Sequence, residues 1–226
     1  MYDGLIAVPR LVPVFPLPEV VLFPGMALPL HIFEPRYREM TRDALAGTRC
    51  VAVAQLKPGF EPLYFTGCAP IHDVLGVGRV VRASALPDGR FDILLRGVIR
   101  ARIVRECSTR SYRVAEIEPI HCDCGGTPGT VIALRERLRS AIESRLNWET
   151  ALRERLVDLC AAPLSLGALV DTLAGVLPLD AETRQELLCE SNVCRRARKL
   201  ISRIEARHCV ERADLAAELD RAGSMN

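Results

Sequence analysis

The chain has 226 residues, of which 49% are hydrophobic and 26% charged, with a formal net charge of +2. This length and apolar content suit one large or two small domains with a packed core. The near-zero charge gives no bulk electrostatic reason to expect a nucleic-acid or membrane partner.

The length of the uncharged runs and the number of cysteines indicate the cellular compartment of the protein. The longest uncharged run, residues 20–33, contains Pro24, Gly25 and Pro29 and is shorter than the ~20 residues that span a bilayer. No secretory signal is recognisable at the start. The nine cysteines are an odd number without paired spacing, which is typical of reduced thiols. We therefore expect a cytoplasmic protein with no membrane partner, cofactor or metal.

Prolines dominate the first 40 residues and exclude a long helix there. Two short apolar runs between them, Val20–Phe23 and Met26–Leu30, predict strands separated by a turn at Pro24-Gly25. Pro35 is suited to the first position of a helix, where its missing N–H costs nothing. We expect that helix to run to about Ala46.

The next 70 residues are predicted to be mainly β. Short runs rich in Val, Ile and Leu alternate with turn residues, at Cys50–Leu56, Val74–Arg82, Phe91–Leu95, Val98–Val104 and Tyr112–Ile117. The segment Leu86–Arg90, LPDGR, is typical of a hairpin turn, because Pro presets φ and Asp-Gly tolerates positive φ.

A glycine-rich segment, Cys122–Gly129, interrupts this pattern, and beyond it the apolar period changes from two to about 3.6. Three helices are expected: one from Val131 to Leu146, one that begins after Ser165 and stops at Pro178, and one from Val193 onward. Ser165, Asp180 and Asn192 are the expected N-caps. The predicted domains are residues 1–121, a linker at 122–129, and a helical bundle at 130–226.

Several long motifs resemble one known family. They are FPLPEVVLFPG (Phe15–Gly25), LPLHIFEPRYREM (Leu28–Met40), LPDGR (Leu86–Arg90) and QELL (Gln185–Leu188). The chain is similar in these motifs to the N-terminal substrate-binding domain of the ATP-dependent Lon proteases, in a stand-alone form. The resemblance implies an α+β fold: a partly closed, mainly antiparallel, PUA-like β-barrel followed by a helical bundle. It also implies a module without ATPase or peptidase domains that recognises unfolded or extended polypeptide, with a protease or chaperone as a candidate partner.

Catalytic motifs are not found. A phosphate-binding loop needs Gly-Lys-Ser/Thr, but Lys57 precedes Pro58 and Lys199 precedes Leu200. There is no G-x-S-x-G or H-E-x-x-H pattern. We expect no catalytic residue and no enzyme activity.

The corner formed by Phe33, Glu34, Pro35, Arg36 and Tyr37 is the predicted partner-binding site. Loop and helix-start positions carry binding more often than core positions do. Glu34 and Arg36 either brace the start of the helix or present a charged rim to a partner.

Two alternative functions remain open. One is RNA binding by the face Arg79–Arg113, where nine arginines stand against three acidic residues and Phe91 and Tyr112 offer stacking surfaces. We do not expect nucleic acid, because acidic helices elsewhere neutralise the chain. The other is a metal or thiol site at His121–Cys124, with Cys68 and His72 as distant partners. That segment supplies half of a zinc site at most.

Overall fold

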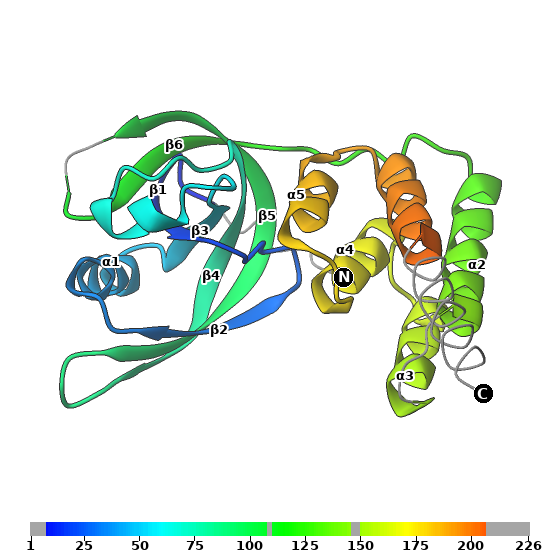
Figure 1. Ribbon diagram of the computed structural model, residues 1–226, viewed down its shortest axis with the longest axis horizontal. Helices are drawn as coiled ribbons and strands as arrows, with labels where there is room; N and C mark the ends of the chain where they lie inside the picture. The colour runs from blue at the N-terminus through cyan, green and yellow to red at the C-terminus, as the bar shows by residue number, and fades with distance from the viewer. Residues whose placement is uncertain (1–7, 108–109, 146–149, 207–226) are drawn as a thin grey trace, which may run out of the picture. The chain divides into compact units, whose positions relative to one another are not determined.

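The structure is a computed structural model that describes residues 8–107, 110–145 and 150–206 (Figure 1). The chain divides into two compact units. The strand unit comprises Met1–His121 and Ala174–Ser191, and the helical unit comprises Cys122–Leu173 and Asn192–Asn226. Residues 174–191 thus group with the strands. The predicted division into domains at 1–121, 122–129 and 130–226 stays a prediction.

The strand unit alternates strands with short helices. In chain order its elements are β1 (Leu11–Leu17), β2 (Ala27–Ile32), α1 (Pro35–Ala46), β3 (Cys50–Gln55), the 3-10 helix η1 (Glu61–Thr66), β4 (Val74–Ala85), β5 (Phe91–Cys107), β6 (Arg113–Pro119) and α5 (Ala181–Cys189). The helix α5 packs on β4, and Gln185 donates from Nε2 to the Val74 carbonyl at 2.7 Å.

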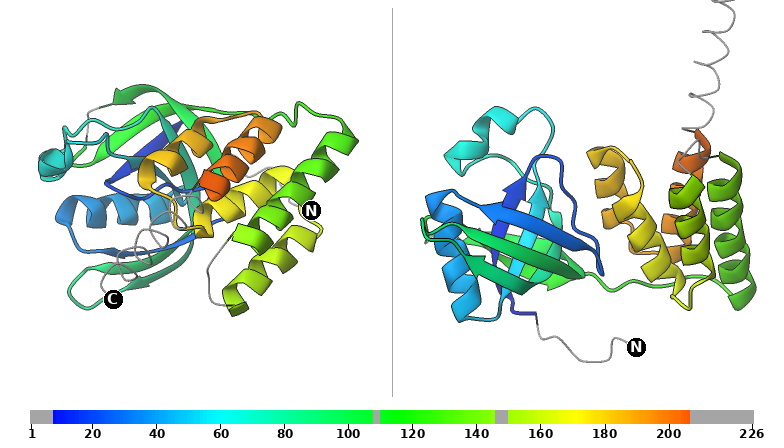
Figure 2. Two further views of the ribbon diagram at one scale, coloured as in Figure 1. Left: turned by 45° about the vertical axis from the view of Figure 1, so that its right-hand side comes forward. Right: turned by 90° about the horizontal axis from the view of Figure 1, so that it is seen from below.

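The six strands form one curved sheet in the order β2-β5-β4-β3-β1-β6, and β5 also pairs with β6. Five strands therefore close into a ring, while β2 lies outside it along the first part of β5. Both views of Figure 2 show this curvature. Of the strand pairings described, only β1–β3 is parallel. The α+β class and the partly closed, mainly antiparallel sheet are confirmed, although β2 keeps the sheet from being a clean barrel.

The centre of the strand unit is β3, whose six residues are all buried. Because side chains alternate along a strand, Cys50, Ala52 and Ala54 pack into one apolar cluster inside the ring. Val51 and Val53 pack into a second cluster on the opposite face, where α1 contributes Met40. A strand buried on both faces reads as a continuous apolar run, which is why the sequence predicted it correctly.

The predicted strand at Val20–Phe23 is wrong. These residues have no regular secondary structure, yet Leu22 and Phe23 are completely buried. Their backbone crosses two strands at glycines: a Cβ atom on Gly76 would lie 1.9 Å from the Leu22 carbonyl oxygen, and one on Gly97 would lie 2.0 Å from that of Phe23. The segment is held by this close approach and not by strand pairing.

Two further strand predictions are corrected. The first strand is β1, which contains Pro13 and Pro16 and was not predicted because prolines weaken a strand. β1 accommodates these prolines because its two neighbouring strands pair with different parts of it. β6 pairs with Leu11–Val14 and β3 with Val14–Leu17, so each proline has a paired strand on one side only. The runs Phe91–Leu95 and Val98–Val104 form one continuous strand, β5, which passes through Gly97.

The predicted helix and hairpin of this unit are confirmed. The helix α1 begins with Pro35 and ends at Ala46. The turn Leu86–Arg90 joins β4 to β5, with Gly89 at a φ of +80°. The 3-10 helix η1 was not predicted.

The helical unit contains α2 (Pro128–Arg145), α3 (Thr150–Ala161), most of α4 (Leu166–Val176) and a helix at residues 193–206. α3 was not predicted. The expected caps are confirmed: Ser165 accepts from the Ala168 N–H at 3.2 Å and Asn192 from the Arg195 N–H at 2.9 Å. Within the described ranges, no helix is both long and apolar enough to cross a membrane.

Charged side chains stabilise this unit from within. Arg196 and Asp171 form an ion pair at 3.0 Å in which the two side chains are 1% and 6% exposed. Arg135 donates to the carbonyls of Cys160 and Ala162, at 2.8 and 3.1 Å, and to that of Leu164. These bonds serve the Cys160 carbonyl in the last turn of α3, which has no helical partner, and two carbonyls of the segment that follows the helix.

Candidate functional site

The five residues of the predicted site lie together where β2 ends and α1 begins, but they differ in accessibility. Phe33 is 58% exposed and Pro35 is also exposed, whereas Tyr37 is 3% exposed. The Tyr37 ring packs against Phe15 with 4.3 Å between ring centroids. Phe33 and Pro35 are therefore accessible to a partner, and Tyr37 belongs to the core.

Glu34 and Arg36 form a brace, which is one of the two roles considered for them. Their ion pair spans 2.9 Å from Nη2 to Oε2, and the side chains are only 14% and 17% exposed. Arg36 also donates to the Tyr64 carbonyl at 3.0 Å and to the Phe65 carbonyl at 3.5 Å. The start of α1 is thereby tied to η1, an element far along the chain.

Two aromatic rings pack against the guanidinium of this brace. The Arg36 guanidinium lies 4.5 Å from the centroid of Tyr37 and 5.5 Å from that of Tyr64, within the range of cation–π attraction. Burial is the main cause that raises the pKa of both tyrosines, and the charge of Glu34 raises it further. Both phenols are therefore neutral at physiological pH, and the brace adds no net charge to the surface.

The 3-10 helix η1 adds exposed apolar side chains that the sequence reading missed. Leu63 is 41% exposed and Phe65 75% exposed. The Phe65 ring meets that of Tyr64 edge-on at 5.0 Å, which fixes its base while most of its surface faces solvent. A signal existed in the sequence: EPLYF lies between Pro58-Gly59 and Gly67, without the period of a buried strand or helix. We call Phe33, Pro35, Leu63 and Phe65 the aromatic corner.

At least five of the nine arginines on the Arg79–Arg113 face are buried or paired with carboxylates. Arg100 is 2% exposed. Four others have carboxylate partners on the same unit, in the pairs Arg90–Asp88, Arg105–Glu116, Arg110–Asp43 and Arg113–Glu106. Burial and pairing thus reduce the free positive charge that an RNA backbone would require.

The segment His121–Cys124 gathers no metal ligands in the structure described. Nowhere in residues 8–107, 110–145 and 150–206 do three His, Cys, Asp or Glu side chains converge as a metal site would need. The Cys122 sulfur lies 3.8 Å from Nη1 of Arg196, and the Cys124 sulfur lies 3.9 Å from that of Cys194. Cys124 therefore faces a second thiol, which the sequence spacing did not indicate.

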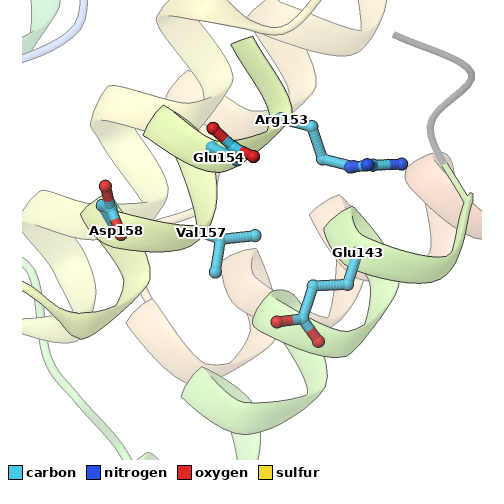
Figure 3. A pocket seen from close by; sticks show the side chains of 5 residues that line it. All are labelled: Glu143, Arg153, Glu154, Val157 and Asp158. Atoms are coloured by element: carbon cyan, nitrogen blue, oxygen red, sulfur yellow. The ribbon is translucent and has the colours of Figure 1, made fainter. Parts of the chain in front are cut away.

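The helical unit has a shallow hollow of ≈ 200 Å³ between α2 and α3, lined by Glu143, Arg153, Glu154, Val157 and Asp158. Figure 3 shows Val157 and Glu143 facing one another across it. Its lining is mostly carboxylate and contains no histidine, cysteine or serine. A shallow hollow lined by surface carboxylates gives no basis for a reaction, so we assign no chemistry to it.

The chain is similar to proteins of one family. A family model described as the ATP-dependent protease La (LON) substrate-binding domain matches residues 11–206. A Lon protease of Roseiflexus castenholzii is 30% identical over 201 residues, covering 88% of this chain and 24% of the relative. Lon protease 1 of Syntrophobacter fumaroxidans is 26% identical over 200 residues, covering 86% of this chain and 23% of the relative. The chain thus spans about a quarter of the length of these relatives.

Solved structures agree on the fold. The N-terminal domain of a Mycobacterium avium complex Lon protease superposes with a TM-score of 0.68 at 18% identity, covering 87% of this chain and 98% of that one. A Lon N-terminal domain protein from Xanthomonas campestris gives a TM-score of 0.59 at 24% identity, covering 85% and 97%. At these identities the likeness supports the fold alone.

Proposed function

Because the chain belongs to the ATP-dependent protease La (Lon) substrate-binding domain family, we propose that it is a non-catalytic module that binds unfolded or extended polypeptide. A protease or a chaperone is the class of partner to which such a module would deliver its substrate, and the cytoplasm is the proposed location. Its peptide-binding surface is proposed to be the aromatic corner.

The observation that carries this proposal is the exposure of two phenyl rings on a braced support. Phe33 and Phe65 are 58% and 75% exposed, although burying such a side chain would stabilise the protein by about 1.5–3 kcal/mol. The Arg36 bonds that tie η1 to α1 restrain the backbone on which these rings stand. Exposed aromatic side chains on a rigid support are typical of binding surfaces.

The chemistry of this surface suits apolar peptide segments of low sequence specificity. Phe, Leu and Pro side chains offer contact area but few directional hydrogen bonds, so many apolar sequences would be accepted. Affinity is expected to be weak, because an extended segment loses conformational freedom when it docks, and this loss offsets much of the apolar burial.

The test is binding of a dye-labelled, reduced and carboxymethylated lactalbumin, followed by fluorescence anisotropy. We expect Phe33→Ala and Phe65→Ala each to weaken binding roughly tenfold, since loss of a buried aromatic contact at an interface commonly costs about 1–2 kcal/mol. Their thermal stability should remain close to that of the parent, because both rings face solvent.

Two matched controls use apolar side chains of similar exposure elsewhere. Val104→Ala on β5, at 55% exposure, and Ile132→Ala on α2, at 68%, should bind as the parent does. Equal binding by all four variants would remove the aromatic corner as the site. Failure of the parent protein to bind any unfolded polypeptide would contradict the proposed function itself.

A further inference from the structure

Two cysteines that are 70 residues apart in the sequence meet inside the helical unit. The sulfur atoms of Cys124 and Cys194 are separated by 3.9 Å. Cys194 is completely buried, and Cys124 is half-buried. Neither cysteine belongs to the aromatic corner, so their proximity is not explained by the proposed function.

The backbone holds the two residues side by side. Asp123 and Asn192 form an isolated parallel bridge. The Val193 N–H donates to the Asp123 carbonyl at 2.8 Å, and the Cys194 N–H donates to the Cys124 carbonyl at 3.3 Å. Asn192 also caps the helix at 193–206, so Cys194 lies in a fixed first helical turn. The sulfur contact is therefore built into the fold and does not depend on side-chain orientation alone.

This geometry is compatible with a disulfide. The bridge pairs Asp123 with Asn192, and the two cysteines lie one and two residues beyond that pair. Bridged backbones are about 5 Å apart, which brings the cysteines close to the Cα separation that an S–S bond requires. A bond of ~2.05 Å would need the two sulfurs to approach by roughly 2 Å, which side-chain rotation can supply. The neighbouring Cys122 contacts Arg196, with 3.8 Å between its sulfur and Nη1.

We propose that Cys124 and Cys194 are a redox-responsive thiol pair, oxidised to an intramolecular disulfide by a hydroperoxide. The Cys124 thiol loses its proton and the thiolate attacks the peroxide oxygen. The O–O bond breaks, sulfenic acid forms, and the hydroxide or alkoxide leaves as water or alcohol with that proton. The Cys194 thiolate then attacks the Cys124 sulfur. The S–S bond forms, the S–O bond breaks, and the hydroxide leaves as water with the Cys194 proton.

The environment of Cys194 sets the speed of the second step. Burial, followed by the interaction with Cys124, raises the pKa of the Cys194 thiol. The attack by Cys194 is therefore slow at neutral pH and accelerates as the pH rises. Arg198 and Asp123 are the charged groups that act on this thiol, and their effects have opposite sign.

The disulfide would close a loop that joins residue 124, just before α2, to the start of the helix at 193–206. Cross-linking a loop of this length restricts the unfolded chain. We expect the midpoint of thermal unfolding to rise by roughly 5–10 °C in a protein of this size, and the rise to disappear on reduction.

The experiment treats the full chain with hydrogen peroxide, blocks free thiols with N-ethylmaleimide, and maps a non-reduced digest by mass spectrometry. The expected result is a linked peptide pair containing Cys124 and Cys194, together with the thermal shift. Cys122→Ser should behave as the parent. Cys124→Ser should lose both the linkage and the shift, and being half-buried it should fold.

Because Cys194 is buried, the more conservative Cys194→Ala is the second variant, with its folding checked by circular dichroism. Oxidation that stops at sulfenic or sulfinic acid, or that links Cys124 to any other cysteine, would overturn the proposal. So would a thermal shift that persists in Cys124→Ser.

Discussion

The strand unit and the helical unit are held together by different kinds of contact. In the strand unit, Leu22 and Phe23 cross Gly76 and Gly97 with backbone packed against backbone. In the helical unit, charged side chains are buried, namely in the pair Asp171–Arg196 and in the Arg135 bonds to carbonyls. The close backbone packing leaves no room for an added atom, whereas the buried ion pair is destabilised when one of its charges is removed. Substitutions that add volume should therefore affect the strand unit most, and substitutions that remove a charge should affect the helical unit most.

The largest expected effect follows from adding one methyl group to the strand unit. Gly76→Ala would place a Cβ atom 1.9 Å from a backbone oxygen that cannot move without disturbing the core. We expect a loss of about 5 kcal/mol or more, measured by urea unfolding or seen as loss of soluble protein. Gly129→Ala is the control, because its Cβ would lie 3.8 Å from Oγ1 of Thr127, at ordinary van der Waals distance. Equal stability of the two variants would contradict the close approach.

The helical unit should respond most to an unpaired charge. Arg196→Met leaves Asp171 buried without its partner, and we expect a loss of about 3–5 kcal/mol. The double variant Asp171→Leu, Arg196→Met removes both charges and should recover most of that loss. Urea unfolding of Arg196→Met, Asp171→Leu and the double variant gives the coupling free energy between the two side chains. A double variant that is as unstable as the sum of the singles would show that packing, and not charge, dominates.

The strand unit has a pH-sensitive contact at Tyr112, whose hydroxyl donates to Asp43 at 2.6 Å. Burial, then this hydrogen bond and the Asp43 charge, raises the pKa of Tyr112 to about 12, against about 10 in an unfolded chain. Between these values the unfolded state has lost a proton that the folded state retains. Stability should therefore fall as the pH rises, by up to about 1.4 kcal/mol per pH unit from this group.

The measurement is urea unfolding from pH 8 to 11.5 for the parent and for Tyr112→Phe. The variant should be less stable at pH 8, because it lacks the hydrogen bond, and should lose less stability above pH 10. Tyr37 and Tyr64 also have raised pKa values, so some alkaline loss remains in the variant. Parallel curves for the two proteins would exclude a contribution from Tyr112.

The smallest effects are expected at the helix N-caps, which occur in both units. Asp180 caps α5 in the strand unit by accepting from the Thr183 N–H at 2.6 Å, and Asn192 caps the helix at 193–206 in the helical unit. Each substitution by alanine should cost about 1 kcal/mol. The costs should add in the double variant, because the two caps serve different helices. Asp180→Asn, which keeps an acceptor, serves as the conservative control in thermal unfolding.

Prediction from the sequence succeeded where local chemistry decides the structure. The Pro35 helix start, the Leu86–Arg90 hairpin, the caps Ser165, Asp180 and Asn192, and the doubly buried strand β3 all depend on residues close together in the chain. It failed for Val20–Phe23 because the apolar run of a buried irregular segment is indistinguishable from that of a strand. The prediction missed β1 because proline normally argues against a strand. The prolines are tolerated in β1 because the neighbouring strands β3 and β6 need no N–H from those two positions.

The candidate site shows the same limit. The sequence by itself determined the family resemblance, the α+β class and the helix start at Pro35, because these depend on residue identity and order. Only the tertiary structure decided that Glu34 and Arg36 are a brace, that Tyr37 is core, that Arg36 ties α1 to the exposed Phe65 of η1, and that Cys124 meets Cys194. The last two of these facts require residues 29 and 70 positions apart in the chain to lie side by side. No local propensity encodes such a distance, since it follows from how the whole chain buries its apolar surface.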